Sequence, residues 1–109
     1  TPSYKREEVE SEKVITSFFK AGQKIELLAS TSEDGVIARF IEKKGEGIHH
    51  IAFHTDDIYA EMQRLREAGF TLLQDQPKKG ADGKLVCFVH PKGTQGVLVE
   101  LCMDDPDLA

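Results

Sequence analysis

Runs of β-branched, aromatic and other apolar residues are separated along the chain by polar segments that contain glycine. Residues 13–19 (KVITSFF) and 24–29 (KIELLA) have the composition of strands, and Ala21-Gly22-Gln23 between them predicts a tight turn. Residues 85–90 (LVCFVH) and 97–101 (VLVEL) have the same character. The pattern therefore predicts two β-hairpins, one near each end of the chain.

Helical spacing of apolar residues marks two other segments. In residues 36–44, apolar side chains recur at positions i, i+3 and i+4 and Gly45 follows, which predicts a short helix. A second helix is expected over residues 58–68, because Asp56 or Asp57 can accept a hydrogen bond from its first turn. The chain is therefore expected to be of the α+β class.

The remaining segments are shorter. Residues 47–55 (GIHHIAFHT) predict a strand directly before the second helix, and residues 72–74 predict a short strand after it. The acidic tail, residues 104–109, is expected to fray.

The two predicted hairpins resemble each other and suggest an internal repeat. Each contains a lysine, an apolar strand, a turn with lysine and glycine, and a strand that ends in apolar-Glu-Leu, at Glu26 and Glu100. The second hairpin is preceded by a strand and a helix, residues 48–68, whose counterparts in the first unit would fall before Thr1. We therefore expect one and a half repeat units, with the first strand and helix of the first unit absent from this chain.

The composition of the chain indicates which classes of binding partner can be expected. The chain has 109 residues and a formal net charge of −5, which argues against a nucleic-acid-binding protein because such proteins carry a basic patch. No apolar run approaches the roughly 20 residues of a membrane helix, and nothing resembles a signal peptide, so a cytoplasmic protein is expected. Cys87 and Cys102 lie in apolar strand patterns and are expected to be reduced.

Three residues are candidates for chemistry. Glu26 and Glu100 occupy matching positions of the repeat within apolar strands, and a buried carboxylate must be paired, hydrogen-bonded or bound to a metal ion. Strand alternation places His50 on the side of its strand opposite the more apolar, helix-facing positions, which include His49. One imidazole and two carboxylates would suit Co²⁺, Mn²⁺, Ni²⁺, Zn²⁺ or Fe²⁺.

Each candidate also has a structural interpretation. A single strand glutamate is more often an edge or solvent-facing residue, and a single strand histidine more often packs or pairs locally. We expect structural or surface roles for the other three histidines, His49, His54 and His90.

The motifs GEGIHHIAF (45–53), Asp56-Asp57-Ile58, HPK (90–92) and GVLVEL (96–101), together with Ile25-Glu26-Leu27-Leu28, resemble the methylmalonyl-CoA epimerases. These enzymes belong to the vicinal oxygen chelate, or glyoxalase-like, superfamily, whose domains pair two βαβββ units around a metal. The resemblance implies a single domain over residues 1–109. It would comprise the remaining strands of the first unit (1–35), a connector helix (36–46) and a complete second unit (47–103).

The resemblance also implies roles for the three candidates. His50, Glu26 and Glu100 match metal ligands, and Glu100 also matches an acid/base residue. The family's other histidine ligand would lie on the absent first strand. Some relatives have a glutamate base where Thr16 stands here, so the second acid/base is unassigned.

The implied reaction is the interconversion of (2R)- and (2S)-methylmalonyl-CoA by proton removal next to the thioester. A divalent ion, Co²⁺ first and otherwise Mn²⁺, Ni²⁺, Zn²⁺ or Mg²⁺, would stabilise the resulting enolate. An acyl-CoA substrate and a homodimer are expected, with neither nucleic acid nor a membrane as partner. A glyoxalase I-like isomerase and a metal-free ligand-binding module of the same fold are the alternatives, since fold alone does not fix function.

Overall fold

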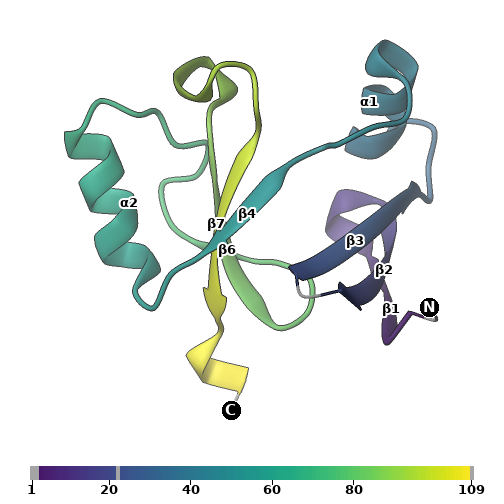
Figure 1. Cartoon of the computed structure of the whole chain (residues 1–109), viewed down its shortest axis with the longest axis horizontal. Helices are drawn as coiled ribbons and strands as arrows, with labels where there is room; N and C mark the ends of the chain where they lie inside the picture. The colour runs from purple at the N-terminus through teal and green to yellow at the C-terminus, as the bar shows by residue number, and fades with distance from the viewer. Residues whose placement is uncertain (1–2, 22, 109) are drawn as a thin grey trace. The chain divides into compact units, whose positions relative to one another are not determined.

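The computed structural model describes residues 3–21 and 23–108. These residues fall into two compact units, which meet in the sequence between Gly47 and Ile48. Figure 1 shows the elements of both units along the chain. Each unit is described by itself.

The first unit is a three-stranded antiparallel sheet with one helix. The strands β1 (Lys5–Val9), β2 (Val14–Ala21) and β3 (Gln23–Ser30) lie in that order, and α1 (Val36–Lys44) follows β3. The predicted strands and helix are confirmed, whereas β1 was not predicted because its sequence, KREEV, is mostly charged. Gly22 of the predicted turn lies outside the described residues.

The core of the first unit lies on one face of its sheet. Alternate residues of β2, Val14, Thr16 and Phe18, are buried there, and Ile37 of α1 is buried as well. Thr16 is only 2% exposed, so it is a core side chain.

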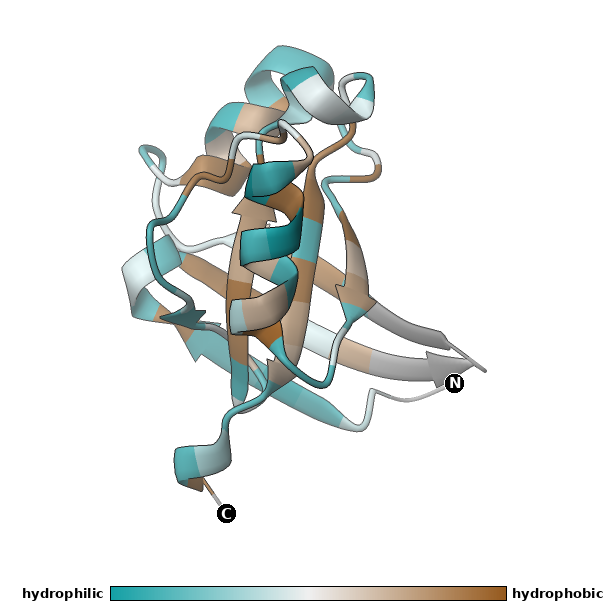
Figure 2. Ribbon diagram, turned by 90° about the vertical axis from the view of Figure 1, so that its left-hand side faces the viewer, coloured by the Kyte–Doolittle hydropathy of each residue, from teal (hydrophilic) through white to brown (hydrophobic). Residues whose placement is uncertain are grey.

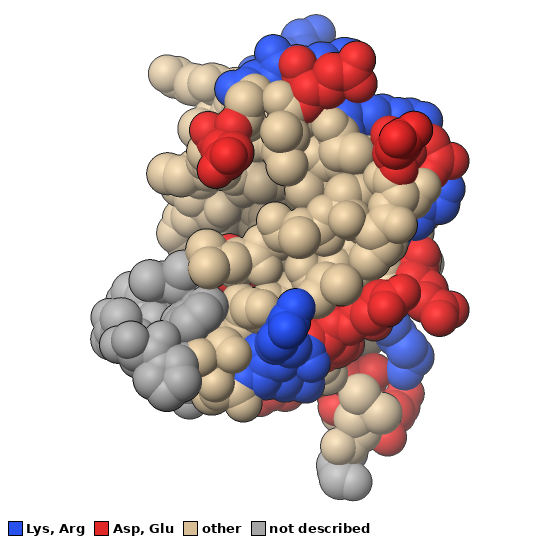
Figure 3. Space-filling model, turned by 90° about the vertical axis from the view of Figure 1, so that its right-hand side faces the viewer, with Lys and Arg blue, Asp and Glu red and all other residues tan. Residues whose placement is uncertain are grey.

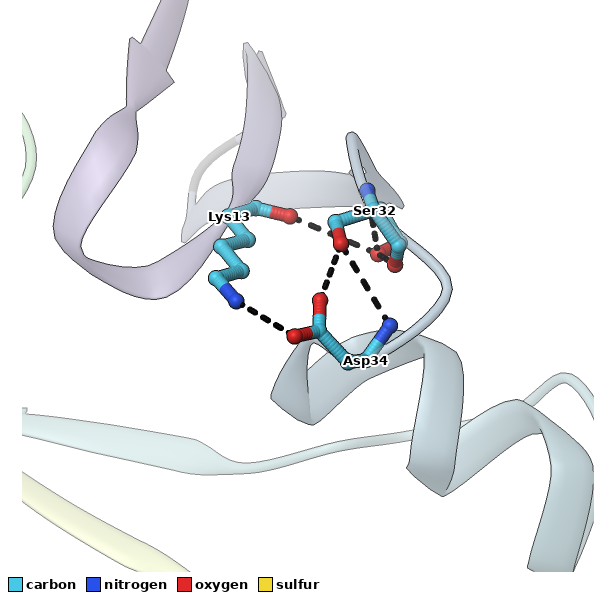
Figure 4. A network of polar contacts seen from close by, with 4 residues as sticks. Lys13, Ser32 and Asp34 are labelled. Carbon is cyan, nitrogen blue, oxygen red and sulfur yellow. Dashed lines mark hydrogen bonds and ion pairs between the residues drawn. The ribbon is translucent and has the colours of Figure 1, made fainter.

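Hydrogen bonds connect Lys13, the residue before β2, with the segment that follows β3 (Figure 4). Its backbone is left-handed, with φ at 56°, and its carbonyl accepts a hydrogen bond from the Thr31 N–H at 2.8 Å. Its Nζ donates to Asp34 Oδ2 at 2.7 Å, and the Ser32 hydroxyl donates to the other carboxylate oxygen. These donors lower the pKa of Asp34 from 3.8 to about 2, chiefly through the bond from Lys13.

The second unit has the order βαβββ. It comprises β4 (Ile51–His54), α2 (Ile58–Glu67), β5 (Lys78–Lys79), β6 (Lys84–Val89) and β7 (Val99–Asp104). The sheet order is β4-β7-β6-β5, with β4 parallel to β7 and the other pairs antiparallel. This is the complete unit that the sequence predicts.

The helix α2 covers one face of this sheet (Figure 2). Asp57 caps it by accepting a hydrogen bond from the Ala60 N–H at 3.1 Å, as the sequence predicts. Ile58 and Met62 pack with residues of the central strands. The cluster consists of Ile58, Met62, Leu85, Cys87 and Leu101. Cys87 has a free thiol and is fully buried.

Three predictions for the second unit were wrong in detail. The strand expected from residue 47 begins only at Ile51, after a segment with Gly45 and Gly47. The strand expected at 72–74 is reduced to an isolated bridge from Leu72 to Val89. The tail does not fray throughout, because Asp105 is buried and bonded to Lys79 Nζ at 2.7 Å.

Charged side chains of both signs appear on the surface drawn in Figure 3, in small groups separated by uncharged residues. Among the described residues, no helix has the length and apolar character that a membrane crossing requires.

Candidate metal and acid–base site

The register of the second sheet determines where Glu100 points. Glu100 of β7 lies opposite Ala52 of β4 and Phe88 of β6. Its neighbour Leu101 belongs to the core under α2. Because side chains alternate along a strand, Glu100 lies on the face that α2 does not cover.

The structure brings His50 to the same carboxylate. His50 Nε2 lies 3.8 Å from Glu100 Oε1, and the two side chains are only 14% and 15% exposed. Burial lowers the pKa of His50 below its ordinary value of 6.5, because it disfavours the charged imidazolium. The neutral ring that results is the form that binds metal ions.

An aromatic ring borders this pair. The Phe88 ring meets the His50 ring edge-to-face, with centroids 5.9 Å apart. The Phe88 ring also has a cation beside it, because Lys78 Nζ lies 5.7 Å from its centroid. The site thus combines a neutral imidazole, a half-buried carboxylate and an apolar wall with a cation beside it.

His49 also reaches His50, contrary to the prediction that it faces the helix side. Its Nδ1 lies 3.0 Å from His50 Nδ1, and the rings are edge-to-face at 5.2 Å. Strict alternation failed here because residues 49 and 50 precede the first residue of β4. The two glycines before the His-His pair, Gly45 and Gly47, are the sequence signal that this strand starts late.

Glu26 belongs to the first unit, on β3, and is partly buried. It lies directly opposite Phe18 in the β2–β3 hairpin, just as Glu100 lies opposite Phe88 in the β6–β7 hairpin. The two glutamates therefore occupy corresponding places in two similar hairpins, as the repeat predicted.

The His50–Glu100 pair is compatible with a shared metal ion. Two ligand atoms that each lie about 2.1 Å from one ion can be at most about 4.2 Å apart, and the observed separation is 3.8 Å. A nitrogen and a carboxylate oxygen suit a borderline divalent ion. Within the described residues, no group of three or more His, Cys, Asp or Glu side chains is gathered as a metal site.

The other two histidines have local partners. His54 Nε2 lies 3.4 Å from Asp56 Oδ1 in an exposed pair. His90 Nδ1 accepts a hydrogen bond from the Lys92 N–H at 3.0 Å and caps a short 3-10 helix, Pro91–Thr94. These contacts agree with the surface and structural roles expected for them.

Sequence reasoning missed Phe88 and Lys78 as neighbours of the pair. A signal for Phe88 was available, because a phenylalanine stands across from the glutamate in both hairpins.

This chain is similar to known proteins, both to a superfamily model and to individual relatives. Residues 2–88 match the model of the Glyoxalase/Bleomycin resistance protein/Dioxygenase superfamily. An uncharacterised protein of Bacillus subtilis, YqjC, is 43% identical over 98 residues, which cover 89% of this chain and 70% of that protein.

Two further relatives have named activities. An ethylmalonyl-CoA/methylmalonyl-CoA epimerase of Cereibacter sphaeroides is 51% identical over 80 residues, 72% of this chain. The match spans 60% of that enzyme's length. A solved methylmalonyl-CoA epimerase in complex with methylmalonyl-CoA and NH4+ superposes with a TM-score of 0.90 at 33% identity, covering 95% of this chain and 77% of that one.

Proposed function

The chain belongs to the glyoxalase, bleomycin resistance protein and dioxygenase superfamily, and we propose that it catalyses the metal-dependent interconversion of (2R)- and (2S)-methylmalonyl-CoA. The observation that carries the proposal is the half-buried His50–Glu100 pair on the sheet face that α2 leaves uncovered. Relatives named as epimerases of this substrate support it.

The proposed ligands are His50 and Glu100, with Glu26 of the first unit as a further one. His50 would bind through Nε2, the atom that faces Glu100. Its burial favours the neutral ring that binding requires. A bound divalent ion such as Co²⁺ would supply positive charge that stabilises negative charge developing on the thioester oxygen.

Glu100 is also the proposed proton acceptor. The hydrogen to be removed lies on the carbon between the thioester and the carboxylate of the substrate. Removing it as a proton leaves the electron pair delocalised onto the thioester oxygen, and returning a proton to the opposite face inverts the carbon. A positioned carboxylate typically accelerates such a transfer by about 10² to 10⁴.

Phe88 and Lys78 extend this proposal. Phe88 contacts the His50 ring and limits its rotation. An apolar ring beside the pair would lower the local polarity and so strengthen electrostatic interactions there. The Lys78 ammonium next to Phe88 gives this side of the sheet a positive charge that favours an anionic substrate.

A paired-substrate assay tests the proposal against its alternatives. The full-length protein is loaded with Co²⁺ and offered (2R)-methylmalonyl-CoA, whose conversion to the diastereomeric (2S) thioester is followed by chromatography. The hemithioacetal of methylglyoxal and glutathione is offered in parallel. Turnover of methylmalonyl-CoA supports the proposal. Turnover of the hemithioacetal alone would favour a glyoxalase I-like enzyme, and turnover of neither would favour a binding module.

A further inference from the structure

The strand register identifies the side chains on either side of Glu100. Its strand β7 lies between β4 and β6, and Glu100 is paired with Ala52 of β4 and Phe88 of β6. Paired residues of neighbouring strands project from the same face of a sheet, with the strands about 4.8 Å apart. Ala52 and Phe88 therefore flank Glu100 on the face that α2 does not cover.

The two flanks of Glu100 differ in size. On the β6 side, Phe88 presents an aromatic ring that also meets the His50 ring, with centroids 5.9 Å apart. On the β4 side, Ala52 presents a single methyl group and is exposed. The surface beside the carboxylate is therefore filled on one side and open on the other.

Strand propensity does not account for an alanine at this position. Strands favour β-branched and aromatic residues, and alanine is depleted in them. The residues before and after it, Ile51 and Phe53, follow that preference. The small side chain thus stands at the position of β4 that is paired with Glu100.

The reacting carbon of the substrate must approach this surface. A base acts within about 2.6–3.2 Å of the group from which it takes a proton. Besides its hydrogen and the two carbonyl groups, that carbon carries one further substituent, which is a methyl group in methylmalonyl-CoA. Since the Phe88 ring occupies the β6 side of Glu100, the β4 side has the room for this substituent.

We propose that Ala52 is a specificity-determining residue, whose small side chain makes room beside Glu100 for the substituent on the reacting carbon. This inference rests on the proposed function, in which Glu100 takes the proton. A larger side chain at position 52 would occupy the place of the substituent and leave room only for a hydrogen. The size of residue 52 would then set the largest substituent that the enzyme accepts.

Three thioesters that differ only in this substituent test the proposal. The full-length protein is loaded with Co²⁺, and mass spectrometry follows deuterium uptake from D₂O by malonyl-CoA, methylmalonyl-CoA and ethylmalonyl-CoA, after subtraction of the rate without protein. In Ala52→Val, kcat/KM for ethylmalonyl-CoA should fall by about 10- to 200-fold relative to malonyl-CoA, with a smaller fall for methylmalonyl-CoA. An equal change for all three substrates would overturn the inference.

A matched control and a second variant separate size selection from loss of structure. Ala60→Val makes the same change at an exposed position of α2 and should leave all three rates unchanged. Thermal unfolding followed by circular dichroism reports whether each variant folds. If Ala52→Val does not fold, Ala52→Gly decides, because it should raise the rate with ethylmalonyl-CoA relative to methylmalonyl-CoA. An unchanged ratio would contradict the role of Ala52.

Binding measurements distinguish failure of this inference from failure of the proposed function. If the parent protein exchanges none of the three thioesters, the proposed function fails, and calorimetric titration of the same compounds decides the role of residue 52. Affinity that falls in Ala52→Val for ethylmalonyl-CoA but not for malonyl-CoA would support it. Equal affinities of the parent and Ala52→Val for ethylmalonyl-CoA would overturn it.

Discussion

At the residue scale, the chemistry of the site depends on burial more than on residue type. His50 and His54 are four positions apart, yet the first is 14% exposed beside a carboxylate and the second is 56% exposed. The lower exposure of His50 leaves less room for water to compete for its ring nitrogen than at His54.

Replacing Glu100 with glutamine should remove turnover of methylmalonyl-CoA. The amide keeps the size of the side chain but cannot accept the proton, so we expect a loss of at least about 10²-fold in kcat. His54→Gln, a change at an exposed histidine of β4, should leave the rate unchanged. Activity of Glu100→Gln close to that of the parent would exclude the proposed base.

The carboxylate of Asp34 provides an electrostatic test in the first unit. Replacing Lys13 with methionine should raise the pKa of Asp34 from about 2 toward 3.8, because Lys13 is the main cause of its depression. A lowered folded-state pKa means that this interaction contributes stability above about pH 4, and the contribution is lost as pH falls through about 2. Side-chain ¹³C NMR titration measures the value. Lys43→Met on α1 is the control, and an unshifted Asp34 in Lys13→Met would refute the assignment.

At the scale of elements, α2 stabilises the second unit through one side only. Met62 is 2% exposed in the core cluster, whereas the next residue, Gln63, is exposed and bonds Glu67 at 3.2 Å. Met62→Ala should lower the free energy of unfolding by about 2–5 kcal/mol, because it removes buried side-chain atoms and leaves a cavity.

The matched control is Gln63→Ala, for which we expect a change within about 0.5 kcal/mol. Urea denaturation compares the two variants. Similar destabilisation by both changes would mean that α2 does not pack on the sheet as described.

The elements show what the sequence could and could not predict. The helices and both hairpins were predictable because their apolar periods and their capping or stopping residues, such as Asp57 and Gly45, agree locally. The strand β1 was not, because its charged residues leave no apolar alternation. The late start of β4 was missed for a different reason, since residues 47–50 continue into the apolar run of β4 without a break in the sequence that marks where the strand begins.

The sequence predicted part of the candidate site and missed the rest. His50 and Glu100 emerged from strand alternation and the hairpin repeat, and the structure brings them to 3.8 Å. The contact with His49 was not predictable, because it depends on irregular backbone before β4. Lys78 comes close to Phe88 through the pairing of β5 with β6, which a single strand pattern does not encode.

At the scale of the molecule, we propose that a chain of this superfamily catalyses one proton-transfer reaction. The pair that carries the proposal, His50 and Glu100, belongs to the second unit. The proposed reaction needs both a metal ion and a base, so removing either should stop the same step.

Hydrogen exchange at the substrate carbon measures that step directly. The full-length protein is incubated with methylmalonyl-CoA in D₂O, once loaded with Co²⁺ and once stripped of metal, and mass spectrometry follows deuterium at the carbon between the two carbonyl groups. We expect uptake well above background with the metal-loaded protein, and none above background with the metal-free protein or with metal-loaded Glu100→Gln. Background-level uptake by the protein with metal shown to be bound would contradict the central claim.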